Sequence, residues 1–237
     1  MTGREILWRV DAGANNYIRL FGEAEHMESV DNGTYRVVRP KKGEQGVKFV
    51  CDIRPEALDK KTIREIKRLH MPVWWPLQMP YTKPGGDELY MAVLPGEVIS
   101  HGKAEFVRRV DNAGDFARWA SVMCNVTYGG YPYLHPVHHY PLCQRGALRC
   151  FFIEIGGQIA ATAAIMQEGA DASLEFVATE KTHRRQGLAG GVCAAAIADA
   201  FTHGAQLVTL RAGNEGTREL YTSLGFKIYN EELEERP

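Results

Sequence analysis

The stretch ASLEFVATEKTHRRQGLAGG, residues 172–191, decides the fold of this chain. It begins as a strand at 172–179, passes through a charged turn and enters an alanine-rich helix expected at 188–203. The first N–H groups of such a helix have no partner inside the helix. The helix dipole adds a partial positive charge at the same end. Small residues at this helix start therefore predict an anion site suited to a pyrophosphate.

The residue types in the turn support a phosphate cradle. Arg184 and Arg185 supply charge for a phosphate, while Gly187 and Ala189 lack the bulk that would keep oxygens from the backbone. A P-loop is excluded because no lysine followed by Ser or Thr stands here. The dinucleotide fingerprint is excluded because its three glycines and its acidic partner are absent. A plain connection between strand and helix remains the alternative.

The segments around this unit alternate short strands and helices. We expect strands at 150–155, 158–166, 206–211 and 226–229 and a helix at 215–224. The pair Gly156-Gly157 supplies a hairpin turn between the first two strands, and Gly225 ends the helix. Upstream, we expect Asp115 to cap a helix whose apolar face carries Phe116 and Trp119.

The spacing of Arg184, Gly187 and Ala189 resembles the signature of the GNAT superfamily of acyl-CoA N-acyltransferases. That signature is Arg or Gln, two residues, Gly, one residue, then Gly or Ala. The resemblance covers residues 172–229. It implies a mixed α/β fold, with a central and mostly antiparallel sheet that contains a splayed strand pair and is flanked by helices.

A second group of residues agrees with the family in order and spacing. Asn214 precedes Leu220-Tyr221 and Gly225-Phe226. In the family the Asn lies near the cofactor arm, and exposed backbone groups of the first splayed strand pair with the pantetheine amides. The resemblance implies that acetyl-CoA is bound by Val177, Ala178, Thr179, Arg184, Arg185, Gln186, Gly187, Leu188, Ala189, Gly190 and Asn214.

Two residues are predicted to be catalytic. The resemblance makes Tyr221 the general acid that protonates the departing thiolate, the alternative being a core tyrosine beside Leu220 and Leu224. Glu175 is the candidate base, because alternation places it on one strand face with Val177 and half-burial would raise its pKa. The alternatives are a solvated charge at 175 and an ordered water as base. Backbone N–H groups near Val177 are expected to stabilise the oxyanion.

The acceptor pocket is expected in the segment 128–146, which reads as a loop or broken helix rich in Pro, Gly, Tyr and His. His135, His138 and Tyr140 are the predicted lining residues, and a surface position is the alternative. No metal site is predicted, because adjacent histidines project differently and no partner ligand stands out.

Residues 1–100 resemble the reduced first half of a GNAT subgroup with two similar halves, and residues 101–237 are the expected acetyltransferase domain. Asn32-Gly33 predicts a hairpin between 27–30 and 34–39. The rest of the first half would consist of a strand at 46–53, a helix around 63–69, a strand at 71–75 and a closing strand at 89–94.

Composition narrows the class of protein. A formal net charge of −1 gives no footprint for nucleic acid, and no apolar run reaches the length of a membrane-spanning helix. Five cysteines without clip spacing suggest reduced thiols and a cytoplasmic protein. A homodimer is compatible with the sequence.

The expected activity is acetyl transfer from acetyl-CoA to a primary amine of a small molecule or amino acid. A non-catalytic acyl-CoA-binding or regulatory module is the alternative. Transfer from a longer acyl-CoA or an aminoacyl-tRNA is weaker, and the neutral charge balance argues against tRNA.

Overall fold

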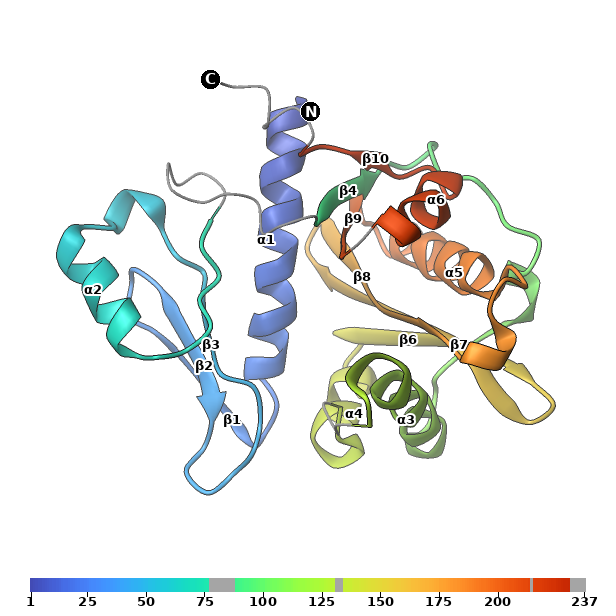
Figure 1. The fold of residues 1–237 in the computed structure, drawn as a ribbon, viewed down its shortest axis with the longest axis horizontal. Helices are drawn as coiled ribbons and strands as arrows, with labels where there is room; N and C mark the ends of the chain where they lie inside the picture. The colour runs from blue at the N-terminus through green and yellow to red at the C-terminus, as the bar shows by residue number, and fades with distance from the viewer. Residues whose placement is uncertain (77–87, 131–133, 214, 231–237) are drawn as a thin grey trace.

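The computed structural model describes residues 1–76, 88–130, 134–213 and 215–230 (Figure 1). These residues form a seven-stranded sheet of order β10-β4-β9-β8-β7-β6-β5 and a three-stranded sheet of order β1-β2-β3. The large sheet contains β4 (Leu89–Val93), β5 (Val107–Arg109), β6 (Leu148–Ile155), β7 (Gln158–Glu168), β8 (Asp171–Thr179), β9 (Leu207–Ala212) and β10 (Lys227–Ile228). The small sheet contains β1 (Met27–Asp31), β2 (Arg36–Pro40) and β3 (Phe49–Cys51).

Helices cover both faces of the large sheet (Figure 1). The covering helices are α1 (Gly3–Gly22), α3 (Ala113–Tyr128), α4 (Pro136–Gln144), α5 (Leu188–Thr202) and α6 (Glu215–Ser223). Helix α2 (Lys60–Arg68) packs against the small sheet instead, and the 3₁₀ turns are η1 (Pro55–Ala57), η2 (Ala104–Phe106) and η3 (Lys181–His183). The core beneath α5 and α6 and the core beneath α3 and α4 are separate apolar clusters on opposite faces. All strand pairs of the large sheet are antiparallel except β8 with β9. The predicted fold class is confirmed.

Helix α1 packs across β4, β9 and β8 on the face opposite α5. Thr2 and Glu5 form a capping box at its start, which satisfies two of the orphan N–H groups. Ile6, Leu7 and Val10 are buried against the sheet. This helix is not among the elements expected from the sequence, although Thr2 followed by Glu5 is a helix-start signal.

Strand β4 corrects the assignment of residues 89–94. These residues were expected to be the closing strand of the N-terminal unit, but β4 pairs with β9 and β10 inside the large sheet. A division of the chain at residue 100 would remove β4 and α1 from the sheet that they complete. Two segments of the first hundred residues thus help to build the surroundings of the site described below.

The other elements expected from the sequence are present in the structure, but some strands are shorter than expected. Both predicted hairpins form, with Gly33, Gly156 and Gly157 at positive φ. The strand expected at 46–53 is only β3, and the one expected at 71–75 is reduced to a single bridge at Val73.

Two expectations about residues 113–146 need correction. Asp115 is not a cap, because Asn112 accepts the N–H of Asp115 and the helix begins before it. The segment 128–146 was expected to be a loop or broken helix, and its part 136–144 is the helix α4, which begins at Pro136, a residue suited to the first helical turn, and contains Pro141.

Candidate active site

Strands β8 and β9 run parallel and then separate. Their pairing ends at Ser173 with Thr209, while β8 continues to Thr179 and β9 to Ala212. Beyond Ser173, in the described part of the chain, the edge of β8 that faces β9 has no strand partner. The unpaired edge exposes backbone donors and acceptors to the space between the strands. This is the splayed strand pair that the resemblance implied.

A β-bulge interrupts β8 just past the opening. Ala164 pairs with Glu175 and Thr162 with Ala178, so two residues, Phe176 and Val177, lie opposite one residue of β7. Phe176 has φ +54, a left-handed value that an L-residue adopts only when its surroundings hold it. The Thr162 hydroxyl donates to the Phe176 carbonyl oxygen at 3.1 Å and helps to fix the bulge.

The bulge changes which side chains share a face of the sheet. Leu174 and Val177 both pack toward α5, whereas Phe176 and Ala178 pack toward α3. Glu175 is paired with Ala164, which belongs to the α3 side. The expectation that Glu175 shares a face with Val177 is therefore wrong, because a bulge shifts the alternation of a strand by one residue.

Glu175 is half-buried on the face that α1 and α3 cover. Burial raises the pKa of its carboxyl group to about 7, while the Arg211 guanidinium and the Ser173 hydroxyl pull this pKa down. Within the described residues, Glu175 has no ion pair. A carboxylate with a pKa near neutrality is suited to accept a proton from an amine.

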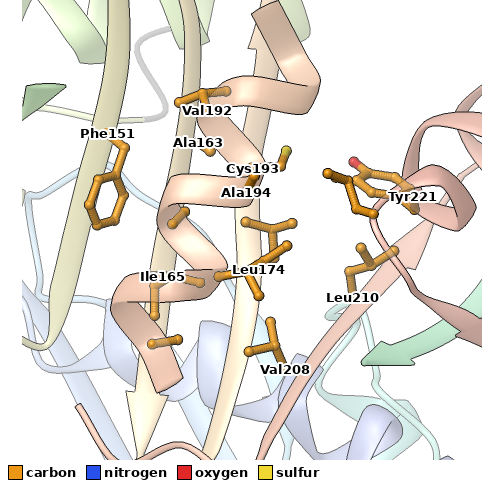
Figure 2. Close-up of a cluster of buried hydrophobic side chains, with 14 of the residues drawn as sticks. Phe151, Ala163, Ile165, Leu174, Val192, Cys193, Ala194, Val208, Leu210 and Tyr221 are labelled. Carbon is orange, nitrogen blue, oxygen red and sulfur yellow. The ribbon is translucent and has the colours of Figure 1, made fainter. Parts of the chain in front are cut away.

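Tyr221 reaches the opening from the other face. Figure 2 shows its ring extending from α6 toward α5, with its hydroxyl on the side of Cys193. It is buried beside Leu224 and Phe226, and its hydroxyl has no hydrogen-bond partner among the described residues. Burial raises the pKa of Tyr221 above its ordinary value, and Cys193 and Glu175 act in the same direction. Tyr221 is thus a core residue whose hydroxyl stays protonated at neutral pH.

The turn that leads into α5 is open on its outer side. Arg184, Arg185 and Gln186 are exposed, and Gly187 adopts a left-handed φ of +76 as the N-cap. No side chain caps the helix. The N–H groups of residues 188–190 have no partner within the described structure, so they are free to hold an anion.

The glycines behind this turn serve a second purpose. A Cβ at Gly190 would lie 2.6 Å from the His101 ring, and one at Gly191 would lie 2.5 Å from the Cβ of Lys103. His101 also lies 3.2 Å from the position of a Cβ on Gly187. The segment 101–103 therefore packs against the helix start and places two basic side chains there. Sequence reasoning missed both, since they lie more than eighty residues upstream of the turn.

The predicted acceptor residues gather elsewhere. His135 and His138 stand at the start of α4, where the rings of His138 and His26 are stacked with centroids 4.0 Å apart. The Tyr140 hydroxyl donates to the carbonyl oxygen of Asp111 at 3.2 Å. Ring contacts from His139 through Phe21 to Phe176 separate this group from the bulge. Their role in acceptor binding stays a prediction, and the predicted Asn214 lies outside the described residues.

Arg211 is a residue of the site that sequence reasoning did not select. It projects from β9 on the α1 side, and its guanidinium carbon lies 3.5 Å from the centroid of the Trp74 ring. Its Nη1 donates to Glu88 at 3.3 Å. The Trp74 indole in turn donates to Asp11 at 3.5 Å. A lone Arg at the end of a strand gives no signal in the sequence, since Trp74 and Glu88 approach only in the fold.

A surface groove of about 740 Å³ lies beside the far end of β8. It is lined by one side of α3, the turn between β6 and β7, and the residues Glu180, Thr182 and His183 that precede the turn at Gly187. Among the described residues, no cluster of His, Cys, Asp and Glu has the arrangement of a metal site. None of the described helices combines the length and apolar character that a bilayer crossing needs.

Comparison with known structures places the fold. A GCN5-related N-acetyltransferase from Kribbella flavida shares it with a TM-score of 0.62, 19% identity and 92% of each chain covered. An acetyltransferase of the GNAT family from Novosphingobium aromaticivorans, described as putative, gives a TM-score of 0.57 at 19% identity over 94% of this chain and 91% of that one. A conserved protein of unknown function from Staphylococcus epidermidis gives 0.54 at 11% identity over 84% and 88%. A search of curated proteins by sequence finds no match.

These distant structures show only the fold, and a family model identifies the family. It is described as the acetyltransferase (GNAT) family, and it matches residues 115–226. The match runs from the first turn of α3 to the residue before β10 and so contains the splayed strands, the bulge, the turn at Gly187 and Tyr221. Residues 115–226 therefore form an acetyltransferase domain of the GNAT family, and the chain is an enzyme of this acetyl-CoA-dependent acyltransferase class.

Proposed function

We propose that this protein transfers the acetyl group of acetyl-CoA to the primary amine of a small molecule or amino acid. One observation carries the proposal. Glu175 and Tyr221 approach the same opening between β8 and β9 from opposite faces of the sheet, and the open helix start at Gly187 lies at the end of β8. A base, an acid and an anion site thus surround one gap.

The residues at the opening fit the donor. The free N–H groups of 188–190 and the exposed Arg184 and Arg185 would hold its diphosphate, with His101 beside them. The unpaired edge of β8 at 177–179 would pair with its pantetheine amides. Bound there, acetyl-CoA supplies a thioester, whose carbonyl carbon accepts the amine nitrogen while the carbon–sulfur bond breaks.

The side chains divide the proton transfers. Glu175 takes one proton from the substrate ammonium and later releases it to solvent. The Tyr221 hydroxyl gives its proton to the departing sulfur, and the second proton of the reacting nitrogen replaces it on the tyrosine. The balance is one ammonium and one thioester giving one amide, one thiol and one proton. The backbone N–H groups of the bulge near Val177 would stabilise the charge on the carbonyl oxygen.

Holding acetyl-CoA and the amine together in one opening raises their effective concentration. In well-oriented systems this lowers the activation barrier by roughly 7–11 kcal/mol. Cys193 is buried, and burial raises the pKa of its thiol, so the thiolate of a covalent route is disfavoured there.

The experiment is titration of purified protein with acetyl-CoA and CoA by calorimetry, followed by thiol release from acetyl-CoA across a library of primary amines. Binding together with amine-dependent thiol release supports the proposal. Absence of binding to both compounds contradicts it. Binding with no turnover on any amine would favour a regulatory module that senses acyl-CoA.

A further inference from the structure

We propose that Arg211 binds a carboxylate of the acceptor, so that the preferred acceptor is an amino acid whose amine lies close to that carboxylate. The inference rests on the acetyl-transfer function proposed above and names the acceptor class of the same site. Residues outside the family signature carry it: Arg211, Trp74 and Glu88.

The position of Arg211 follows from the register of the two strands. Ser173 and Thr209 are the last pair of β8 and β9, and both face α1. Two residues further on, Glu175 and Arg211 project on that same face, one from each strand. Arg211 is also paired with Tyr90 of β4, whose ring belongs to the cluster beneath α1. An acceptor whose amine reaches Glu175 thus has Arg211 as its first basic neighbour across the gap.

The guanidinium retains donors for a ligand. Its side chain is 19% exposed, and its described hydrogen bond is the one from Nη1 to Glu88. A guanidinium has five N–H donors arranged in a fork that matches a carboxylate. Leaving such donors unused in a half-buried place is unfavourable unless water or a ligand takes them. The remaining donors of Arg211 are free, among the described residues, to bind a carboxylate.

The surroundings hold this fork in place. The Trp74 ring lies against the guanidinium at 3.5 Å and is itself tethered through its indole to Asp11. The Tyr90 ring lies 6.0 Å away on the strand next to β9. A planar guanidinium stacks on aromatic faces, whereas the ammonium of a lysine is a compact point charge. The packing therefore selects an arginine at this place and orients it before a ligand arrives.

The other charged side chains on the α1 face of the opening favour an acceptor that carries both a positive and a negative charge. Asp11, Glu88 and Glu175 are acidic, and Arg211 is the basic group that faces them. An ammonium group is attracted by the acids, and a single carboxylate is attracted by Arg211. A dianion would meet repulsion from the three acids, and a simple amine would leave the guanidinium without its partner. A zwitterionic amino acid satisfies both requirements.

The test compares acceptors that differ only in the carboxylate. Phenylalanine, phenylalaninamide and phenethylamine form one such series, and each amino acid of a full panel can be paired with its amide. Thiol release from acetyl-CoA gives kcat and KM for each compound. The expected result is a kcat/KM at least about 10-fold higher for amino acids than for their amides, since charge-assisted bidentate pairs are among the stronger hydrogen bonds.

Substitution of Arg211 separates recognition from folding. We expect R211Q to raise KM for the best amino acid by about 10²-fold and to leave acetyl-CoA binding unchanged. Because Arg211 lowers the pKa of Glu175, kcat should change less than about 3-fold only at a pH where the Glu175 carboxylate is fully formed in both proteins. R211K should recover only part of the loss. For the amides, R211Q should change KM less than about 3-fold. The control is R36Q, which removes an arginine of similar exposure, 23%, that pairs with Asp31 and Asp52 in the small sheet.

A second variant keeps the inference falsifiable if R211Q folds poorly. E88Q leaves the arginine in place and removes its acidic partner, so KM for amino acids should stay the same or fall. If E88Q raises KM as much as R211Q does, the arginine acts through its ion pair and the inference is overturned. Equal turnover of amino acids and amides also overturns it, while the acetyl-transfer function then stands. Failure of that function would appear instead as absent acetyl-CoA binding.

Discussion

Glu175 and Arg211 occupy corresponding positions on β8 and β9, each two residues beyond Ser173 and Thr209, the last pair that joins these strands. The strands separate between them, so a carboxyl group and a guanidinium group line the two sides of the opening on the α1 face. The bulge at Phe176 follows immediately and turns the next side chain, Val177, to the α5 face. Successive residues of β8 thus present their side chains to opposite faces of the sheet in an order that strict alternation would not give.

The base predicts a pH dependence of the rate. Because burial raises the pKa of Glu175 to about 7, kcat/KM should rise with pH through this value as the carboxylate forms. The substitution E175Q should lower kcat by about 10²- to 10⁴-fold, the usual range for a general base. A pH–rate profile of both proteins checks this. Retention of the limb near pH 7 in E175Q would assign that limb to another group.

The same carboxyl group predicts a pH dependence of stability. Its pKa in the folded state, about 7, lies above the ordinary value of 4.5, so between these values the folded protein holds a proton that the unfolded chain has lost. The stabilising contribution is complete below pH 4.5 and disappears as pH rises through 7. Each unit of pKa corresponds to about 1.4 kcal/mol, so E175Q should be more stable than the wild type at pH 8 by up to about 3 kcal/mol.

Urea denaturation at pH 5 and pH 8 measures this difference directly. The gap between E175Q and the wild type should widen from pH 5 to pH 8. A gap that is the same at both pH values would mean that Glu175 is well solvated in the folded state.

Tyr221 predicts a loss of rate without a loss of binding. The variant Y221F removes only the hydroxyl, which lacks a partner among the described residues, so the fold should be little disturbed. We expect kcat to fall by about 10- to 10²-fold, with the calorimetric Kd for CoA changed less than about 3-fold. Y35F is the matched control, because Tyr35 is equally buried, 8% exposed, but lies just before β2, in the apolar cluster beside the small sheet. If kcat of Y221F equals kcat of Y35F, Tyr221 is only a core residue.

Sequence reasoning reached the parts of the site that local chemistry determines. Gly187 and the small residues after it signal a helix start open to an anion, and the hairpin at Gly156-Gly157 is encoded in two adjacent residues. The bulge at Phe176 could not be predicted, because alternation alone gives no sign of an extra residue. The face of Glu175 relative to Val177 was wrong for that reason.

What sequence reasoning missed depends on contacts between distant segments. Arg211 is oriented by its contacts with Trp74 and Glu88, which are distant in the sequence. His101 lies in the connection that follows β4 and contacts the turn at Gly187. Helix α1 is a different case, since its capping box is a local signal that was available in the sequence. Its place over β8 and β9 was not, because packing against a sheet leaves no short motif.

The turn at Gly187 predicts how CoA affinity responds to a single methyl group. G187A places a Cβ on a residue with φ +76 and within 3.2 Å of His101. The left-handed conformation costs an L-residue about 1–2 kcal/mol, so the turn should shift and CoA binding should weaken about 10-fold. Calorimetry with CoA and with pantetheine, which lacks the diphosphate, provides the measurement.

The weakening should be confined to CoA, since only CoA has the diphosphate that these N–H groups would hold. G156A is the matched control, because Gly156 also has a positive φ, +58, but a Cβ there meets nothing within 4 Å. It should cost similar backbone strain and leave CoA binding unchanged. Equal weakening of CoA and pantetheine by G187A would place the diphosphate elsewhere.

Helix α1 contacts Ser173 and Thr209, the last pair that joins β8 and β9. This contact predicts that a glycine-to-alanine substitution in α1, normally stabilising, lowers the stability of the fold. Replacing glycine by alanine inside a helix normally stabilises it by about 1 kcal/mol. At Gly13, however, a Cβ would lie 2.6 Å from the Thr209 Oγ1, and Ser173 Cβ is 3.9 Å away. G13A should therefore destabilise the fold by about 1–3 kcal/mol, as overpacking does. G3A, whose new methyl would meet Tyr229 only at 3.9 Å, is the control in the same helix.

A double substitution identifies the cause. T209A removes the obstructing hydroxyl, together with its hydrogen bond to the Ala172 carbonyl oxygen, so G13A should cost less in the T209A background than alone. Urea denaturation of the four proteins gives the coupling energy. Measuring kcat/KM for the same four proteins tests whether α1 fixes the geometry of the opening. A displaced α1 would move Ser173 and Thr209, the last pair before β8 and β9 separate, and with them Glu175 and Arg211. Additive costs in both measurements would mean that α1 and the opening are independent.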